Sequence, residues 1–210
     1  MIITWHGLSF FKIKAKELSL WIDPLDQKTY GLKASSSVPS VSLLSSPDLL
    51  KYDQKTLRAS EYVFKNPGEY EAKDIGVHIG SSLGDKKNAN NTFIIDWNGL
   101  SIVHLGAIKQ KSSLGKFLEK VNGVDVLMIP VGGKSVLSAS DAVELVHQIE
   151  PSVVIPMFYK TDKESKIDLD DEKYFIQEMG KQEKEELDKL KIEASSSDKE
   201  KTRLVILTSS

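Results

Sequence analysis

The chain has no cysteine and only 4 histidines among its 210 residues. The absence of cysteine excludes disulfides, thiolate metal sites, iron–sulfur clusters and a thiol nucleophile. The scarcity of histidine limits any metal site built from imidazoles. No stretch reaches the roughly 18–20 apolar residues that a transmembrane helix needs, and the N-terminus has no signal-peptide pattern. We therefore expect a cytoplasmic chain with no membrane partner.

A surplus of charge of either sign is also missing. The 28 basic and 30 acidic residues give a formal net charge of -2, whereas dedicated nucleic-acid binders carry a basic surplus. We therefore expect no nucleic-acid partner. Residues 162–201, however, hold 14 acidic against 9 basic residues. This balance predicts a solvated acidic segment, part helix and part linker, within a single domain over 1–210; an acidic partner-binding tail is the alternative.

What is present is a 40% hydrophobic fraction, enough for a real core, distributed in short periodic runs. The first half is rich in strand patterns and the second half alternates helix with strand. Asn98-Gly99 is the strongest turn signal, and residues 84–91 are typical of a polar hairpin loop. Strands are expected at 2–5, 9–14, 18–22, 41–44, 62–64, 76–80, 92–96, 100–104, 124–130, 153–156 and 204–207, and helices at 112–121, from Ser138 onward and at 174–179.

Several segments carry a resemblance by their order and spacing. They are Trp5-His6-Gly7, Trp21-Ile22-Asp23-Pro24, Asn66-Pro67-Gly68-Glu69-Tyr70-Glu71, Ile102-Val103-His104-Leu105-Gly106, residues 124–133 and Ile155-Pro156-Met157. Together they resemble the metallo-β-lactamase superfamily, in particular a small cytoplasmic branch similar to ascorbate-6-phosphate lactonase. The resemblance covers nearly the whole chain. It implies an α/β (α+β) class, a four-layer αββα sandwich of two mixed sheets with helices outside.

The chemistry of that family depends on a metal site, which this sequence lacks in its usual form. The family carries T-H-x-H-x-D-H after a strand, then H-x-G-D, then a histidine after Ile-Pro-Met, because two divalent metals need several imidazole and carboxylate donors. In alignment with that pattern, Asp48 and His104 keep their ligand positions. The other ligand positions hold Leu8, Leu44, Ser46, Leu49, Ala107 and Phe158.

The histidine count makes this loss independent of where gaps are placed. No histidine lies between His6 and His78, so no shift of the alignment restores the central motif. A catalytic zinc normally has three protein ligands, and Asp48 with His104 supplies two. Apolar side chains at the ligand positions would fill an emptied polar cavity. We therefore expect no cofactor; zinc or manganese is the alternative.

Three functions stay open at this point. The first is a homologue without metal or hydrolase activity, which acts as a binding, assembly or regulatory module for a protein or small-molecule partner. The second is an active metal-dependent hydrolase of a small phosphorylated or lactone-like substrate, with an atypical site drawn from Asp23, Asp48, Glu69 and His104. The third is a metal-free enzyme that uses the old pocket. We favour the first, and because members of the family often oligomerise, we expect a homo-oligomer.

Overall fold

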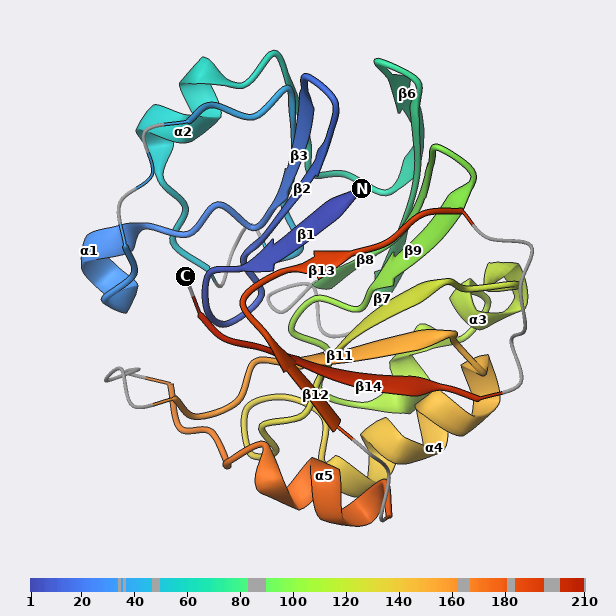
Figure 1. Cartoon of the computed structure of the whole chain (residues 1–210). Coiled ribbons are helices and arrows are strands. Elements are labelled where there is room, and N and C mark those ends of the chain that lie inside the picture. The colour runs from blue at the N-terminus through green and yellow to red at the C-terminus, as the bar shows by residue number, and fades with distance from the viewer. Residues whose placement is uncertain are drawn as a thin grey trace.

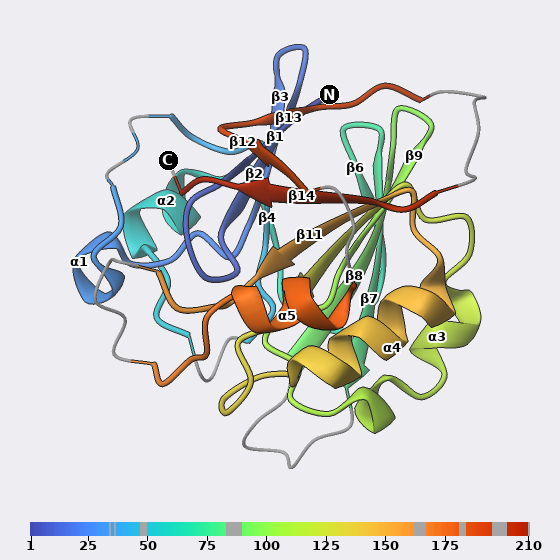
Figure 2. The same cartoon turned by 60° about the horizontal axis from the view of Figure 1, so that its bottom comes forward.

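Two β-sheets packed face to face form the centre of the molecule (Figure 1). The computed structural model describes residues 1–33, 35, 37–46, 50–82, 90–161, 167–180, 184–194 and 201–209. Helices α1 and α2 lie beside the first sheet, and α3, α4 and α5 lie beside the second (Figures 1 and 2). This arrangement confirms the predicted αββα sandwich. No helix among the described residues is long and apolar enough to cross a membrane.

Within the described residues, the first sheet has six strands in the order β13-β1-β2-β3-β4-β5. They are β1 (Ile2–Trp5), β2 (Phe11–Ala15), β3 (Leu18–Ile22), β4 (Val41–Leu43), β5 (Tyr62–Phe64) and β13 (Leu190–Lys191). The first three form an antiparallel meander, whereas β4 and β5 continue the sheet parallel to β3. The carboxyl ends of β3 and β4 therefore meet at one edge of this sheet.

The second sheet has eight strands within the described residues, in the order β12-β14-β11-β10-β9-β8-β7-β6. They are β6 (Gly68–Ala72), β7 (Ile75–Ser82), β8 (Asn90–Trp97), β9 (Leu100–His104), β10 (Val126–Pro130), β11 (Val153–Met157), β12 (Lys184–Leu187) and β14 (Arg203–Leu207). Strands β6 to β9 are antiparallel, and β9, β10, β11, β14 and β12 are parallel. Parallel strands buried on both faces are nearly all apolar, as β10 and β11 are here.

The helices are short, apart from one. They are α1 (Gln27–Tyr30), α2 (Gln54–Ala59), the 3₁₀ helix η1 (Lys111–Leu114), α3 (Phe117–Lys120), α4 (Ala139–Ile149) and α5 (Lys173–Glu178). In α4 the side chain of Ser138 caps the first turn by accepting from the Asp141 amide, as the sequence predicts. The apolar face of α4, with Ala142, Leu145 and Val146, is buried against the second sheet.

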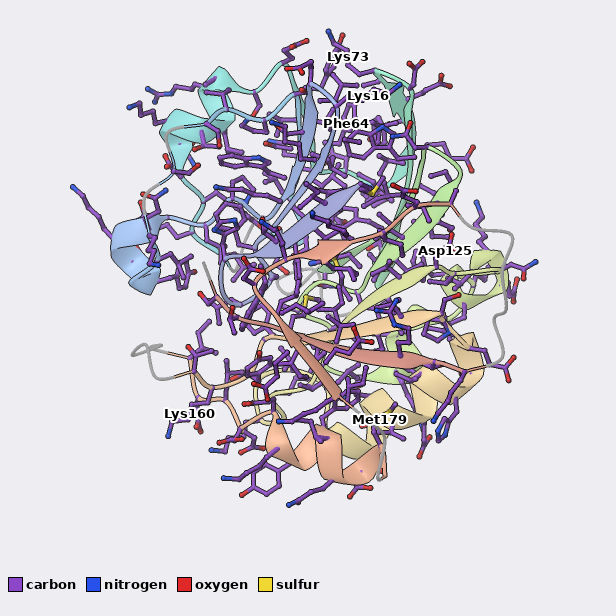
Figure 3. The ribbon with its side chains drawn as sticks, viewed as in Figure 1. Lys16, Phe64, Lys73, Asp125, Lys160 and Met179 are labelled. Atoms are coloured by element: carbon purple, nitrogen blue, oxygen red, sulfur yellow. The ribbon has the colours of Figure 1, made fainter. Side chains whose placement is uncertain are left out.

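Turns follow the expected chemistry. Asn98 and Gly99 both adopt positive φ between β8 and β9, which the two-residue hairpin requires. Lys16 and Lys73 also have positive φ, and Figure 3 shows both at the tips of their hairpins. Residues 84–89 of the predicted hairpin loop at 84–91 lie outside the described residues. Its last two residues, Asn90 and Asn91, are buried and begin β8.

Two predicted helical regions differ from the structure. The expected helix over 112–121 is split into η1 and α3, because Gly115 between them has φ 40 and ψ -124, far from helical values. The acidic segment 162–201 contains α5, but its later part forms β12 and β13 rather than helix or linker. Tertiary pairing explains this difference, since β12 pairs with β14 along its whole length and β13 pairs with β1.

The loop after β10 passes unusually close to the loop after β11. A Cβ atom added at Gly132 would clash with the backbone carbonyl oxygen of Phe158. The φ angle of Gly132 lies outside the left-handed region, so its lack of a side chain serves close approach rather than conformation. The amide of Asp170 also donates to the Gly132 carbonyl at 2.6 Å. Gly132 therefore lets three loops pack at the carboxyl edge of the second sheet.

We expect Gly132→Ala to lower the free energy of unfolding by about 2–3 kcal/mol, because backbone atoms cannot move aside cheaply. Urea denaturation measures this change. The matched control is Gly76→Ala in β7, where an added Cβ would make only ordinary contacts at 3.7–3.8 Å. Equal stability losses in the two variants would contradict the close-approach role of Gly132.

Candidate functional site

Several of the positions singled out from the sequence converge at one edge of the sandwich. Asp23 follows β3, and residues 44–46 follow the neighbouring parallel strand β4. From the second sheet, His104 ends β9 and Phe158 directly follows β11. Ligands bind outside the carboxyl ends of parallel strands in many α/β proteins. The family's metal pocket would therefore lie here, and the side chains present decide what this edge can do.

Asp23 is the fully buried acid of this region, and neutral donors surround it. Its Oδ1 accepts from the Ser45 amide at 2.6 Å and from the Tyr52 hydroxyl at 3.1 Å. Its Oδ2 accepts from the Ser45 hydroxyl at 2.5 Å. Burial raises the pKa of the Asp23 carboxyl to about 6, although hydrogen bonds from Ser45 and Tyr52 oppose this rise. Asp23 also has a positive φ of 50°, which turns the chain out of β3.

Tyr52 and Asn90 extend this network on either side of Ser46. The Tyr52 hydroxyl accepts from the Ser46 amide at 2.9 Å, in addition to donating to Asp23. The Ser46 hydroxyl donates to Asn90 Oδ1 at 3.1 Å, and the Ala107 amide donates to the same oxygen at 2.7 Å. Asn90 Nδ2 donates to the Leu105 carbonyl. A buried amide thus joins the two sheets where the family would place a metal.

Asn91 and Gly106 complete this junction. Asn91 Nδ2 donates to the carbonyls of Leu44 and Lys65, and its own amide donates to the Ser45 carbonyl at 2.6 Å. Gly106 has φ 63, and a Cβ there would clash with Asn90 Oδ1 and meet Ser45 Cβ at 2.9 Å. The Ser45–Ser46 segment is therefore packed directly against residues 104–107, which leaves no room between them for a larger residue.

His104 is buried and both of its ring nitrogens are engaged. Its Nδ1 accepts from the Gly106 amide at 3.0 Å, which assigns the proton to Nε2, and Nε2 lies 3.1 Å from the Ser9 carbonyl. Burial lowers the pKa of His104 to about 3, so the ring is neutral at physiological pH. The ring also packs edge-on against Phe11. A metal ion would have to displace one of these hydrogen bonds.

Apart from Ser46, apolar side chains occupy the other described ligand positions. Leu8, Leu44 and Phe158 are buried in the main core, and Ala107 packs against it. Leu8 and Phe158 both have positive φ, and the Phe158 amide donates to the Leu8 carbonyl at 3.2 Å. The backbone of these two residues forms turns at this edge, and their buried apolar side chains fill the space there.

Two candidates from the sequence lie elsewhere or are not described. Glu69 is on β6, where its exposed carboxylate pairs with Lys120 at 3.2 Å and lies 3.4 Å from His78. The contacts of Glu69 are with Lys120 and His78, not with Asp23 or His104. The geometry therefore does not support Glu69 as a partner in an atypical site. Asp48 and Leu49 lie outside the described residues.

The donor set does not fit a metal centre in the described part of the chain. No three His, Asp or Glu side chains converge there in a way that could hold a metal ion, whereas a catalytic zinc normally takes three protein ligands. Asp23 already accepts three hydrogen bonds, and His104 has both nitrogens engaged. The described side chains form a closed hydrogen-bond network instead.

Sequence reasoning missed four members of this network: Ser45, Tyr52, Asn90 and Asn91. The two asparagines directly precede the apolar strand pattern at 92–96, and a polar pair at the start of a strand is the only local signal. Tyr52 carries no local signal, because its role depends on the chain returning to Asp23 through an isolated bridge between Leu25 and Tyr52.

Asp23 gives this site a pH signature that Asp23→Asn removes. The folded pKa of about 6 exceeds the unfolded value of 3.8, so the folded state binds the proton more tightly. This stabilisation is fully present below pH 4 and is lost as the pH rises through 6. With about 1.4 kcal/mol per pKa unit, we expect the free energy of unfolding of the natural chain to fall by about 3 kcal/mol relative to Asp23→Asn between pH 4 and 8.

Urea denaturation across this pH range measures the difference between the two chains. Asparagine keeps the shape of Asp23, accepts from the Ser45 amide and Tyr52 through Oδ1, and can donate to the Ser45 hydroxyl. His104 is common to both chains, so its own titration cancels in the comparison. Parallel pH profiles for the two chains would contradict the buried, titrating carboxylate.

Comparison with known proteins agrees with this architecture. A metal-dependent hydrolase of Pyrococcus abyssi is 26% identical over 134 residues, which cover 60% of this chain and 59% of the relative. The alignment thus spans less than two thirds of that relative's length. Another relative from the same organism is 24% identical over 182 residues, covering 77% of this chain and 84% of its own.

Solved structures share the fold at low identity. A member of the metallo-β-lactamase superfamily from Thermotoga maritima superposes with a TM-score of 0.76 at 20% identity, over 99% of both chains. Igni18, a metallo hydrolase from Ignicoccus hospitalis, gives a TM-score of 0.67 at 16% identity over 85% of this chain and 89% of its own. The family model of the β-lactamase superfamily domain matches residues 2–158. The chain therefore belongs to the β-lactamase superfamily.

Proposed function

We propose that this chain keeps the superfamily fold without metal-dependent hydrolysis and acts as a non-catalytic binding, assembly or regulatory module. The observation that carries the proposal is the engagement of His104, the one described histidine at a family ligand position. Its Nδ1 lone pair accepts from the Gly106 amide and its Nε2 lies against the Ser9 carbonyl. A ligand histidine instead needs one nitrogen free for the metal and the other held by a partner.

The surroundings of Asp23 support the same proposal. A carboxylate that ligates a metal or activates a water needs an open oxygen directed at the reacting centre. Asp23 is instead fully buried and held by the Ser45 and Tyr52 donors. Buried polar groups satisfied in this way stabilise one packing arrangement of the core. The network therefore replaces the structural role that bound metals play in joining the loops of this edge.

The alternative function is a metal-dependent hydrolase of a small phosphorylated or lactone-like substrate with an atypical site. The name of the Pyrococcus abyssi relative, a metal-dependent hydrolase, favours it. This alternative needs His104 to give up one hydrogen bond and Asp48 to supply a second ligand. Both functions are compatible with the homo-oligomer expected from the sequence, which light scattering of the purified chain would measure.

Metal content separates the two functions. The chain is purified without a metal-affinity tag, and zinc, manganese and iron are quantified by mass spectrometry. We expect well under one metal ion per chain, and a melting temperature that does not change with added zinc, added manganese or a chelator. This result follows if His104 and Asp23 stay in their hydrogen bonds.

The hydrolase alternative predicts the opposite outcome. It requires about one or more chelator-removable metal ions per chain, with the metal lost in His104→Ala. The matched control is His147→Ala, which removes an exposed histidine of α4 distant in sequence from this edge. Metal lost in His104→Ala and retained in His147→Ala would overturn the proposal of a metal-free module. Metal lost only in His147→Ala would identify surface binding and leave the proposal standing.

A further inference from the structure

A second cavity opens beside the closed edge, at the ends of three strands. Its volume is about 400 Å³. Trp5 ends β1, Tyr159 lies two residues after β11, and Leu207 ends β14. Glu186 of β12 and the residues that lead into α5 close another side. Because β11, β14 and β12 are parallel, their carboxyl ends gather here, where α/β sheets commonly bind ligands.

Two aromatic rings form the apolar wall of this cavity. The rings of Trp5 and Tyr159 lie 5.0 Å apart between centroids, and both side chains are largely buried. The indole nitrogen of Trp5 donates to the Leu8 carbonyl at 2.9 Å, so this group is already engaged inside the protein. Trp5 therefore offers the cavity its ring and no hydrogen-bond donor. Rings of this kind attract cations through the negative potential of their faces.

Tyr159 also brings an unengaged hydroxyl to the cavity. The residue is only 5% exposed and lines the cavity wall. None of the hydrogen bonds found for the described residues involves the Tyr159 hydroxyl. The Tyr159 hydroxyl is not among the buried side-chain atoms that lack a partner, so it is accessible from the cavity. A ligand in the cavity could therefore form a hydrogen bond with it.

The charges around this hydroxyl are acidic. Asp171, Glu172 and Glu186 all line the cavity. Burial and the negative charges of these three residues raise the pKa of the Tyr159 hydroxyl well above its usual value. Asp171 pairs with Lys173 at 3.4 Å and Glu186 pairs with Lys184 at 2.7 Å. Glu172 forms no ion pair with any described lysine, arginine or histidine, but it shares a side-chain hydrogen bond with Asp171. Burial and the Asp171 charge raise the pKa of the Glu172 carboxyl, and Lys184 opposes this rise. A cation in the cavity would favour the charged form of Glu172.

Among the described residues, Lys160 is the cation that lines the cavity. Lys160 is exposed, and Figure 3 shows it at the periphery of the molecule. The inner part of the cavity therefore combines two aromatic rings, a hydroxyl with no hydrogen bond to a described residue, and the Glu172 carboxyl, which has no ion pair with a described cation. A metal ion does not suit this set, because no three His, Asp or Glu groups converge to hold one among the described residues.

We propose that this cavity binds an alkylammonium group, with Glu172 as its counter-ion, the Tyr159 hydroxyl as a hydrogen-bond acceptor and the Trp5 ring against its alkyl stem. An ammonium group carries three donors and a full charge, which matches one acceptor hydroxyl and one carboxylate. The stem matches the apolar wall. This assignment does not depend on whether the neighbouring edge holds a metal.

Isothermal titration calorimetry with the full chain tests the proposal. The probe is 1,4-diaminobutane, and the matched neutral probe is 1,4-butanediol, which has the same carbon chain and no charge. A short capped peptide whose only amine is a lysine side chain distinguishes a peptide source of the ammonium group from a free amine. We expect saturable binding of the diamine, the peptide or both, and none of the diol. Equal binding of diamine and diol, or no saturable binding of either amine, would overturn the proposal.

Three variants assign the binding to this cavity. Glu172→Gln removes the proposed counter-ion, and we expect it to weaken binding at least about tenfold. Tyr159→Phe removes only the hydroxyl and keeps the ring; we expect a weakening of about fivefold. The matched control is Glu178→Gln, which makes the same charge change at an exposed position of α5 outside the cavity. We expect no change in the control.

The pattern across the variants decides the outcome. Circular dichroism confirms that each variant is folded before its affinity is compared. Equal weakening in Glu172→Gln and Glu178→Gln would show nonspecific attraction to an acidic surface and would overturn the proposed cavity site. Loss in Glu172→Gln and Tyr159→Phe, with full binding in Glu178→Gln, supports it.

Discussion

The buried carboxylate of Asp23 is the interaction on which this edge of the molecule depends. It holds the end of β3 against the loop after β4 through the backbone and side chain of Ser45, and it holds the returning chain through Tyr52. The Ser45–Ser46 segment then reaches across to Asn90, Asn91 and Gly106 of the second sheet.

The Asp23 carboxylate has an unusual electrostatic character for a buried acid. No cation neutralises it within the described residues; three hydrogen bonds from neutral donors compensate part of the cost of burying its charge. His104 faces the complementary situation, since burial keeps its ring neutral while two backbone groups satisfy its nitrogens. The two groups respond to pH in opposite directions. The raised pKa of Asp23 favours the folded state in acid, and the lowered pKa of His104 disfavours it there.

Under the proposed function, family membership and metal chemistry separate in this chain. The strand order, the parallel second half and the turn conformations at Leu8, Asp23 and Phe158 keep the shape of a superfamily site. The side chains at that site form a closed network and an apolar plug. Function depends on the side chains at a site, and proteins that share a fold can differ in those side chains. The neighbouring cavity at Tyr159 and Glu172 is a different surface, formed beside it at the carboxyl ends of β11, β14 and β12.

Much of the fold was predictable from local patterns. Alternation and turn residues predicted most strands, the Asn98-Gly99 hairpin and the Ser138 cap, because these features depend on neighbours in sequence. The strand at 184–187 was not predictable, since its charged residues Lys184, Glu185 and Glu186 favour strand only through pairing with β14 and through the contact of Glu185 with Arg203. The split at Gly115 likewise depends on how the chain reaches the second sheet.

The amino-acid sequence alone determined that a histidine-rich metal motif is impossible here, because no histidine lies between His6 and His78. Only the tertiary structure decided what replaced it. Ser45, Tyr52, Asn90 and His104 come from separate segments, and their hydrogen bonds join residues up to 95 positions apart. The strength of a buried hydrogen bond and the pKa of a buried acid depend on the groups that folding brings around them. No local sequence pattern contains that information. Composition could therefore show that the histidine-rich motif is missing, but not which hydrogen bonds form in its place.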